Sequence, residues 1–226
     1  MAASTPFLGE KGTTWEGGFR VPLVVRWPGV IEPGRKMNGI ISHEDWFPTF
    51  AAALGEPDIV EKFKQGHEMN GKEFRVHLDG FNMVPYLSGE REDSPRKEIF
   101  YFDQAGNLNA VRVQDWKAHF ATLHGGINTA IRETPAWPVV VNLKADPYER
   151  AWEESELYIR WYGENTMWIF VPIQERIKQF FTSFADFPFQ AGSSLSAGNI
   201  GYQTLRQQQL LQRLNDVETI MPGYRQ

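Results

Sequence analysis

A glycine-rich loop near the start of the sequence carries the residue types best suited to binding an anion. This loop, residues 9–20 (the Lys11 loop), places Lys11 between Gly9 and Gly12. A lysine ammonium supplies a point charge, and backbone N–H groups in glycine turns supply further donors. The spacing matches neither a P-loop nor the dinucleotide-binding fingerprint. From the residues alone, two interpretations stay open: an anion-binding loop and an ordinary surface loop.

Four further residues of the Lys11 loop are expected to support it. Glu16 and Arg20 carry opposite charges and are expected to form a buried pair that holds the loop, with direct ligand contact as the alternative. Gly17 and Gly18 predict a tight turn, because paired glycines permit backbone conformations that other residues avoid.

Other candidate residues favour structural roles. His43 could face a substrate, but its place before Asp45 favours helix entry and packing. His119, His124 and Asp103 match no recognised metal-ligand spacing, so they are expected on a strand surface. Aromatic side chains could stack on a sugar or aryl ring, but they more often fill a core. Core packing is therefore expected for Trp152, Trp161, Tyr162 and Trp168.

Composition excludes several functional classes. The 226 residues include no cysteine, which excludes disulfides, thiolate metal sites and a cysteine nucleophile. The chain has 23 Lys+Arg against 28 Asp+Glu, a net charge of −5 without basic runs, so nucleic acid is not an expected partner. No segment approaches the roughly 18 consecutive apolar residues of a membrane helix, so no membrane partner is expected. The first six residues lack the basic and apolar regions of a signal peptide.

The elements next to the Lys11 loop are predicted from short apolar runs. Residues 21–27 predict a strand buried on both faces of a sheet, ended by Pro28. Asp45 is expected to be the N-cap of a helix that runs from Trp46 to Leu54. Residues 56–98 predict irregular chain with a short helix at 82–87, because charge, glycine and proline interrupt each apolar run.

The second half of the sequence has clearer periodicity. Alternating apolar residues between 97 and 123 predict a three-stranded antiparallel meander, with a fourth strand at 139–143. Helical periodicity begins at Trp152, and apolar positions from Phe170 to Phe184 predict a helix that covers the meander. Residues 187–201 predict an extended surface run, and residues 205–217 predict a last amphipathic helix.

A set of ordered motifs resembles the C-terminal portion of the sulfatase family, particularly bacterial arylsulfatases. The string Lys11-x4-Glu16-Gly17-Gly18-x-Arg20-Val21-Pro22 resembles the second signature region of that family. Further landmarks follow in the family's order: Arg26-Trp27-Pro28-Gly29, Ser42-His43-Glu44-Asp45-Trp46-Phe47-Pro48-Thr49, Asp79-Gly80-Phe81-Asn82 and Asn142-Leu143-Lys144-Ala145-Asp146-Pro147-Tyr148-Glu149. Together the motifs extend over nearly the whole chain.

The resemblance implies an α/β fold and a mechanism for the intact enzyme. The expected fold is the C-terminal part of an alkaline-phosphatase-like sandwich, residues 1–96, plus a C-terminal subdomain of antiparallel sheet with packed helices, residues 97–226. In such an enzyme a formylglycine hydrate attacks the sulfate ester, a divalent cation, usually calcium, holds the sulfate, and the lysine that matches Lys11 contacts it. The fixed ammonium stabilises charge that develops in the transition state. The family is commonly periplasmic or secreted.

The sequence departs from the family where the chemistry begins. The formylglycine motif Cys/Ser-x-Pro-x-Arg is absent, since Ser94-Pro95-Arg96 lacks the intervening residue. The family's metal ligands and catalytic histidines match nothing in this chain. We therefore expect a C-terminal segment that is inactive alone and binds no metal itself. Three origins stay open: a truncated reading frame, a gene fragment, or one piece of a split protein whose partner is the missing N-terminal half. Two alternatives stay open: a phosphate or phosphonate ester hydrolase fragment of the same superfamily, and a non-catalytic binding module.

Overall fold

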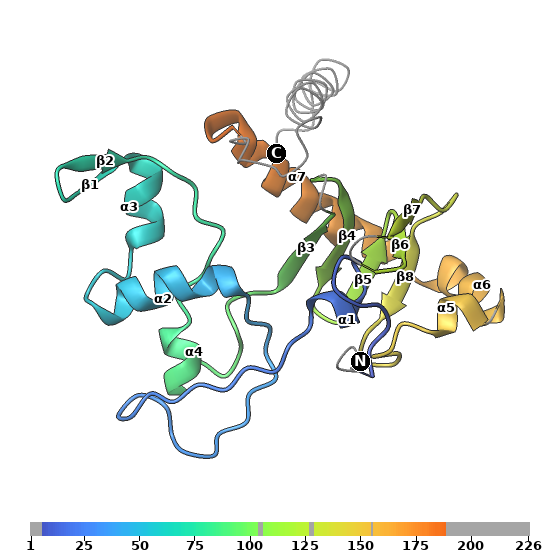
Figure 1. Cartoon of the computed structure of the whole chain (residues 1–226), viewed down its shortest axis with the longest axis horizontal. Coiled ribbons are helices and arrows are strands. Elements are labelled where there is room, and N and C mark those ends of the chain that lie inside the picture. The colour runs from blue at the N-terminus through green and yellow to red at the C-terminus, as the bar shows by residue number, and fades with distance from the viewer. Residues whose placement is uncertain (1–5, 104–105, 127–128, 155, 189–226) are drawn as a thin grey trace.

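In the computed structural model, the described residues are 6–103, 106–126, 129–154 and 156–188, and they form two groups of elements (Figure 1). One group is built around a four-stranded sheet, and the other contains short helices and a small hairpin from residues 43–88. The amphipathic helix predicted at residues 205–217 and most of the extended run at 187–201 lie outside the described residues.

The four-stranded sheet follows the predicted order. Its strands are antiparallel neighbours in the order β3 (Glu98–Phe102), β4 (Leu108–Val113), β5 (Trp116–His119) and β8 (Val139–Asn142). The predicted meander and its fourth strand are confirmed. A second hairpin, β6 (Thr122–His124) with β7 (Ile131–Glu133), has no counterpart in the sequence prediction.

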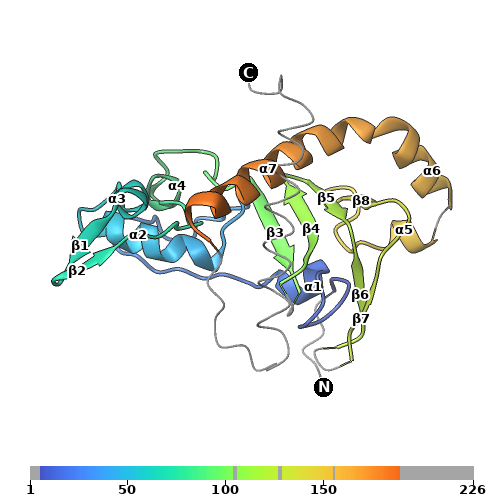
Figure 2. The same ribbon diagram turned by 90° about the horizontal axis from the view of Figure 1, so that it is seen from above.

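One face of the sheet packs against a long helix. The helix α7 (Phe170–Asp186) follows the turn η2 (Met167–Ile169) and runs along the sheet (Figure 2). A buried apolar cluster fills the space between them: Val111, Ala118, Val140, Ile169 and Ile173. At the end of this cluster the ring of Phe180 stacks on Phe100 with 4.3 Å between ring centroids. The predicted helical cover of the meander is confirmed.

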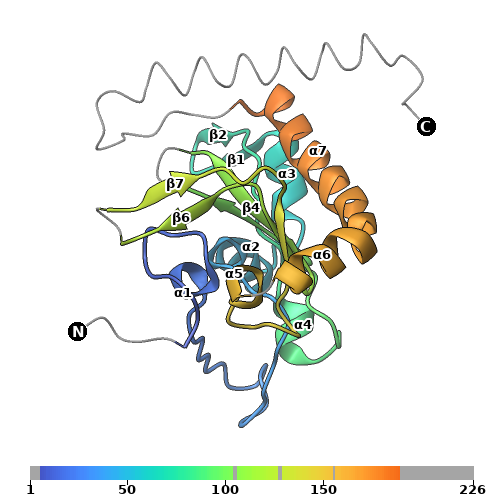
Figure 3. The same cartoon turned by 90° about the vertical axis from the view of Figure 1, so that its right-hand side faces the viewer.

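The opposite face of the sheet carries charge, because side chains alternate between the two faces of a strand. Tyr101, Arg112, Lys117 and His119 occupy the positions between the residues that contact α7. The register pairs Arg112 with Lys117 across β4 and β5, which brings these cations side by side. Figure 3 shows α7 on one side of the sheet and α1 (Glu16–Phe19) on the other.

The remaining elements are short. They are η1 (His43–Asp45), α2 (Trp46–Ala53), α3 (Ile59–Gln65), β1 (His67–Met69), β2 (Lys72–Phe74), α4 (Val84–Ser88), α5 (Ala151–Glu154) and α6 (Glu156–Asn165). The predicted helix from Trp46, the short helix near residues 82–87 and the helical region from Trp152 are confirmed. The prediction of irregular chain is wrong at α3 and at the β1–β2 hairpin. In α3, Ile59 and Phe63 are four residues apart and bury one face of a short helix.

The strand predicted at residues 21–27 does not form. This segment is extended but pairs with no strand of the described residues, and Val24 is 93% exposed. A strand that is apolar on both faces needs neighbouring strands and covering layers on both sides. The described part of the chain supplies neither beside this segment.

Across the described ranges, we find no helix that is both long and apolar enough to cross a membrane.

Candidate active site

The Lys11 loop folds back on itself and leaves Lys11 exposed. The backbone N–H and the hydroxyl of Thr13 both donate to the carbonyl oxygen of Glu10, at 3.0 and 2.8 Å, which forms a turn with Lys11 in its first central position. The N–H of Gly17 donates to the carbonyl oxygen of Leu8 at 2.8 Å and closes the loop. The residues after this turn, from Thr13 to Glu16, are buried. The loop therefore presents one ammonium to solvent from a base that is held inside the protein.

The paired glycines allow the backbone to close this tightly. A Cβ on Gly17 would lie 2.2 Å from the carbonyl oxygen of Gly9, and a Cβ on Gly18 would lie 2.5 Å from that of Thr13. Both distances are shorter than any van der Waals contact, and the atoms in conflict belong to the backbone. No other residue type fits at these two positions without moving the loop.

Glu16 is buried beneath the loop, but its partners are not those expected. Its carboxylate accepts from the Tyr101 hydroxyl at 2.8 Å and lies 3.0 Å from Lys117 Nζ and 3.4 Å from an Arg112 nitrogen. The guanidinium of Arg20 instead lies over the ring of Phe7, 4.4 Å from its centroid. Among the ion pairs of the described residues, the expected Glu16–Arg20 pair is replaced by pairs between Glu16 and the sheet.

Glu149, on the turn after β8, completes this buried cluster. One carboxylate oxygen lies 2.9 Å from Lys117 Nζ and 3.0 Å from His119 Nε2, and the other accepts from the backbone N–H of Glu16 at 2.6 Å. Glu149 has a φ of 53° and no exposed surface. Two carboxylates, Glu16 and Glu149, therefore share Lys117, and Arg112 balances the remaining charge.

The cluster perturbs the ionisation of its members. Burial opposes the charge on Glu149, but the hydrogen bond from His119 and the charge of Lys117 outweigh it and lower the pKa of Glu149 to about 2. Burial lowers the pKa of His119, although its contact with Glu149 acts in the other direction. Burial, together with the charge of Glu16, raises the pKa of Tyr101 well above its ordinary value. At neutral pH Glu149 is therefore ionised, while His119 is neutral and donates from Nε2.

His119 was expected on a strand surface, and this expectation is wrong. Its ring is buried and lies against Trp15, with 4.4 Å between ring centroids. Trp15 also stacks on Trp152, with 5.4 Å between their ring centroids. The indole N–H of Trp15 donates to the carbonyl oxygen of Leu123 at 2.8 Å. Trp15 thus attaches the loop to the sheet next to the charged cluster.

The expectation of core packing fails for two of the aromatic residues. Trp161 and Trp168 are 56% and 57% exposed. Trp152 is half-buried against Trp15, and the side chain of Tyr162 lies outside what the structure describes.

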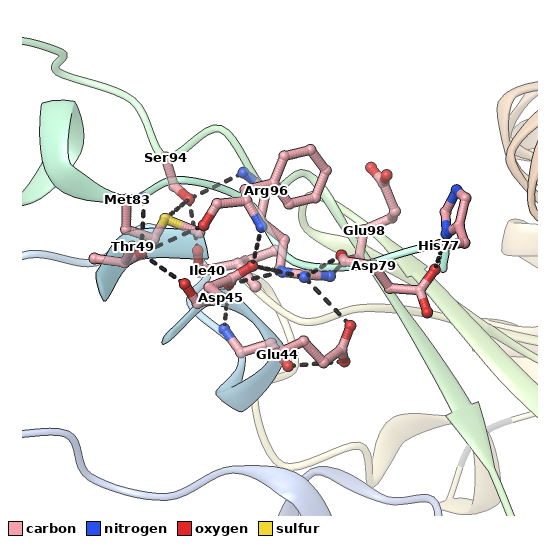
Figure 4. Close-up of polar contacts among 12 residues, drawn as sticks. Ile40, Glu44, Asp45, Thr49, His77, Asp79, Met83, Ser94, Arg96 and Glu98 are labelled. Atoms are coloured by element: carbon pink, nitrogen blue, oxygen red, sulfur yellow. Dashed lines mark hydrogen bonds and ion pairs between the residues drawn. The ribbon is translucent and has the colours of Figure 1, made fainter. Parts of the chain in front are cut away.

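A second buried ion pair organises the other group of elements (Figure 4). The guanidinium of Arg96 binds Asp45 with Nε at 2.9 Å and Nη2 at 2.7 Å, and both side chains are almost fully buried. Asp45 also accepts from the N–H groups of Ser42, at 2.7 Å, and Phe81, at 2.8 Å. Asp45 is the N-cap residue of α2, as expected, but its side chain makes no capping hydrogen bond to that helix. Its carboxylate instead forms a capping box with Ser42, the N-cap residue of η1. His43 is exposed at the entry of this turn.

The carboxylates described beneath the Lys11 loop are already engaged by a lysine and do not form a calcium site. The two carboxylates nearest the Lys11 loop, Glu16 and Glu149, are both engaged by Lys117, and no group of three or more potential ligands occurs among the described residues. The hydroxyl of Ser94 donates to the carbonyl oxygen of Ile40 at 2.6 Å and accepts from the N–H of Arg96. Ser94 therefore has a structural role in the Ser94-Pro95-Arg96 segment.

A cavity of about 780 Å³ opens between the extended segment after the Lys11 loop and the sheet. Its lining includes Glu16, Arg20, Val25, Ile99 and Arg112. The cavity thus combines apolar walls with four cations, Arg20, Arg35, Arg112 and Lys144, and with the carboxylates of Glu16, Glu44 and Asp115. It lies on the side of the chain where residues 21–27 find no strand partner among the described residues.

Sequence reasoning missed most of the residues that hold the Lys11 loop. Lys117 and His119 alternate with apolar residues along a predicted strand, and this alternation could have indicated a polar face. Glu149 closes the last landmark segment quoted above, but nothing in its local sequence connects it with Glu16.

The comparisons with known proteins agree on one family. A model described as Sulfatase matches residues 2–56, and a model described as C-terminal region of aryl-sulfatase matches residues 94–156. The chain is 34% identical over 154 residues to arylsulfatase A of Homo sapiens, which covers 62% of the chain and 27% of that protein. It is 34% identical over 122 residues to steryl-sulfatase of Homo sapiens, covering 51% of the chain and 18% of that protein.

A solved structure has the same fold. The PsFucS1 sulfatase from Pseudoalteromonas sp. superposes on 82% of the chain with a TM-score of 0.65, at 24% sequence identity, and the match covers 34% of that sulfatase. The chain thus spans about a fifth to a third of the length of the relatives it matches. Its mixed helix and antiparallel-sheet architecture is the C-terminal part of the alkaline-phosphatase-like fold that the motifs implied. On these matches the chain belongs to the sulfatase family and corresponds to the C-terminal portion of its members.

Proposed function

We propose that this chain contributes Lys11 and one wall of the substrate pocket to the hydrolysis of a sulfate ester. The observation that carries the proposal is the contrast within the Lys11 loop: Lys11 is exposed, while the residues from Thr13 to Glu16 are buried. Lys11 takes part in none of the ion pairs found between described residues, so its ammonium is available to an anion.

The chemistry assigned to Lys11 is electrostatic. When the ester bond to sulfur breaks, negative charge moves toward the leaving oxygen and the sulfate oxygens. An ammonium that is already in place beside these oxygens stabilises the transition state without reorganising at the moment of reaction. Glu16, Gly17, Gly18 and Arg20 are assigned supporting roles, in which they fix the path of the loop that presents Lys11.

The nucleophile and the metal ligands are assigned to polypeptide outside these 226 residues. The apolar segment 21–27 and the adjoining cavity of about 780 Å³ support this assignment, because an added strand would satisfy the segment's backbone and cover its side chains. Within the chain, we place the division between core remainder and C-terminal subdomain at residues 96 and 97. The chain alone is then expected to be inactive.

The test compares the chain alone with the chain fused in frame behind a sulfatase N-terminal portion that carries the formylglycine motif. Hydrolysis of 4-nitrophenyl sulfate is measured with added calcium. The fusion is expected to hydrolyse the ester, and Lys11→Ala is expected to lower kcat about 100-fold or more, as the loss of one transition-state donor does. The matched control is Lys72→Ala, which removes an exposed lysine from β2.

Two results would contradict the proposal. One is turnover by the chain alone that disappears in Lys11→Ala. The other is a fusion whose turnover is the same with and without Lys11. Running 4-nitrophenyl phosphate beside the sulfate ester distinguishes the sulfatase from a phosphate ester hydrolase of the same superfamily.

A second candidate function rests on the exposed tryptophans. Trp137, Trp161 and Trp168 are 56–70% exposed, and such faces can stack on sugars. Under this alternative the chain is a binding module. Calorimetric titration with a sulfated oligosaccharide is then expected to show binding that Trp168→Ala abolishes and Lys11→Ala leaves unchanged.

A further inference from the structure

The Lys11 loop and the C-terminal sheet are far apart in sequence but are joined by buried polar contacts. Glu16 lies 133 residues before Glu149, 101 before Lys117 and 85 before Tyr101, and it contacts all three. Trp15 reaches the carbonyl oxygen of Leu123, 108 residues away. The C-terminal sheet therefore forms the floor on which the lysine-bearing loop rests.

Glu149 has a special place among these contacts, because it binds both the loop and the sheet. One oxygen accepts from the backbone N–H of Glu16, at the first residue of α1, while the other binds Lys117 and His119 on β5. A bond to the backbone fixes the main chain itself, whereas a bond to a side chain leaves the main chain free to shift. The main chain of the loop is what determines where Lys11 lies, five residues before Glu16.

Lys117 gives this arrangement its rigidity. Its Nζ lies 3.0 Å from Glu16 and 2.9 Å from Glu149, and it also lies 4.0 Å from the centre of the Tyr101 ring. With both carboxylates held by one ammonium, neither can move without leaving a buried charge unpaired. The low pKa of Glu149 means that this carboxylate keeps its charge throughout the neutral range.

We propose that Glu149 is a positioning residue for Lys11: its carboxylate fixes the start of α1 on β5 and thereby sets the location of the ammonium. The proposal rests on the proposed function only for the role of Lys11 in catalysis, since the location of Lys11 can be measured without any reaction.

The absence of cysteine makes that location directly measurable. Cysteines introduced as Lys11→Cys and Gln174→Cys place nitroxide labels on the loop and on the exposed face of α7. Pulsed electron paramagnetic resonance then gives the distribution of distances between the two labels in the full chain. A reference pair, Asp115→Cys with Gln174→Cys, reports on the sheet and contains no loop residue.

Glu149→Gln keeps the size of the side chain and removes its charge. It is expected to broaden the 11–174 distribution about twofold, because the loop opens locally while the sheet remains folded, and to leave the 115–174 distribution unchanged. The matched control is Glu133→Gln, which removes the charge of an exposed glutamate on β7 and is expected to change neither distribution.

The outcomes are separable. An unchanged 11–174 distribution in Glu149→Gln overturns the proposal, and so does broadening of both pairs, which marks a role in general stability. If Glu149→Gln does not fold, Glu149→Asp decides in its place, because it keeps the charge and withdraws the carboxylate by one methylene. Broadening of the 11–174 distribution alone then supports the proposal, and an unchanged 11–174 distribution or broadening of both distributions overturns it. If only the 11–174 distribution broadens, and the sulfatase fusion hydrolyses the ester equally well without Lys11, then Glu149 positions Lys11 but Lys11 has no role in sulfate ester hydrolysis.

Discussion

The acid sensitivity of the chain should depend on Glu149. The pKa of this carboxyl falls from an ordinary 4.5 to about 2 in the folded protein. A folded-state pKa below the unfolded one stabilises the protein above the unfolded value, and this stabilisation is lost as the pH falls through the folded value. At about 1.4 kcal/mol per pH unit, the difference corresponds to about 3 kcal/mol. The free energy of unfolding is therefore expected to fall by about 3 kcal/mol between pH 5 and pH 2 on account of Glu149 alone.

The measurement is urea unfolding at a series of pH values, followed by tryptophan fluorescence, since Trp15 lies beside the cluster. Glu149→Gln cannot titrate, so its free energy of unfolding should start lower at pH 7 and fall less steeply below pH 4.5. Glu133→Gln, on the surface, should follow the parent chain. If the free energy of unfolding falls equally steeply with pH in the parent chain and in Glu149→Gln between pH 4.5 and pH 2, then Glu149 is not the source of the acid sensitivity. His119 contributes separately: its lowered pKa predicts a loss of stability that begins near pH 6.5, as the unfolded chain takes up a proton first.

Three further predictions concern stability at neutral pH, each measured as the free energy of unfolding in urea. Asp45→Asn leaves the charge of Arg96 buried without its partner and should cost about 3–5 kcal/mol; a loss below 1 kcal/mol would show that the pair is solvated. Gly17→Ala places a Cβ 2.2 Å from a carbonyl oxygen and should cost about 1–3 kcal/mol, whereas Gly163→Ala, in α6 with open space around it, should be neutral or stabilise by up to about 1 kcal/mol. Val24→Ser should change stability by less than about 0.5 kcal/mol, because Val24 is 93% exposed, and a larger loss would mean that residues 21–27 pack against something in the isolated chain.

Local patterns in the sequence were enough to predict the C-terminal architecture. The meander follows from period-two alternation and short turns between 97 and 123, and α7 follows from apolar residues at helical spacing from Phe170. These elements depend on neighbours that are near in sequence, so short-range pattern and structure agree.

The failures arise where the environment is set by distant residues. The expected Glu16–Arg20 pair used two charges four residues apart, but the charged partners of Glu16 are Arg112 and Lys117, 96 and 101 residues away on the sheet. His119 was placed on a strand surface because nothing near it in sequence indicates Trp15 above it. Residues 21–27 have the composition of a central strand, but composition cannot supply the neighbouring strands on which such an element depends.

The bond between Glu16 and Glu149 also has a consequence for how the chain acquires its shape during synthesis. The two residues are separated by 133 positions, and a ribosome adds about 5–20 residues per second, so roughly 7–27 s pass between the emergence of one and the other. Throughout that interval the Lys11 loop has no carboxylate to receive the N–H of Glu16, and the apolar residues of segment 21–27 are already exposed. The segment that bears the lysine leaves the ribosome well before the turn after β8, and it cannot take its final position until that turn has followed.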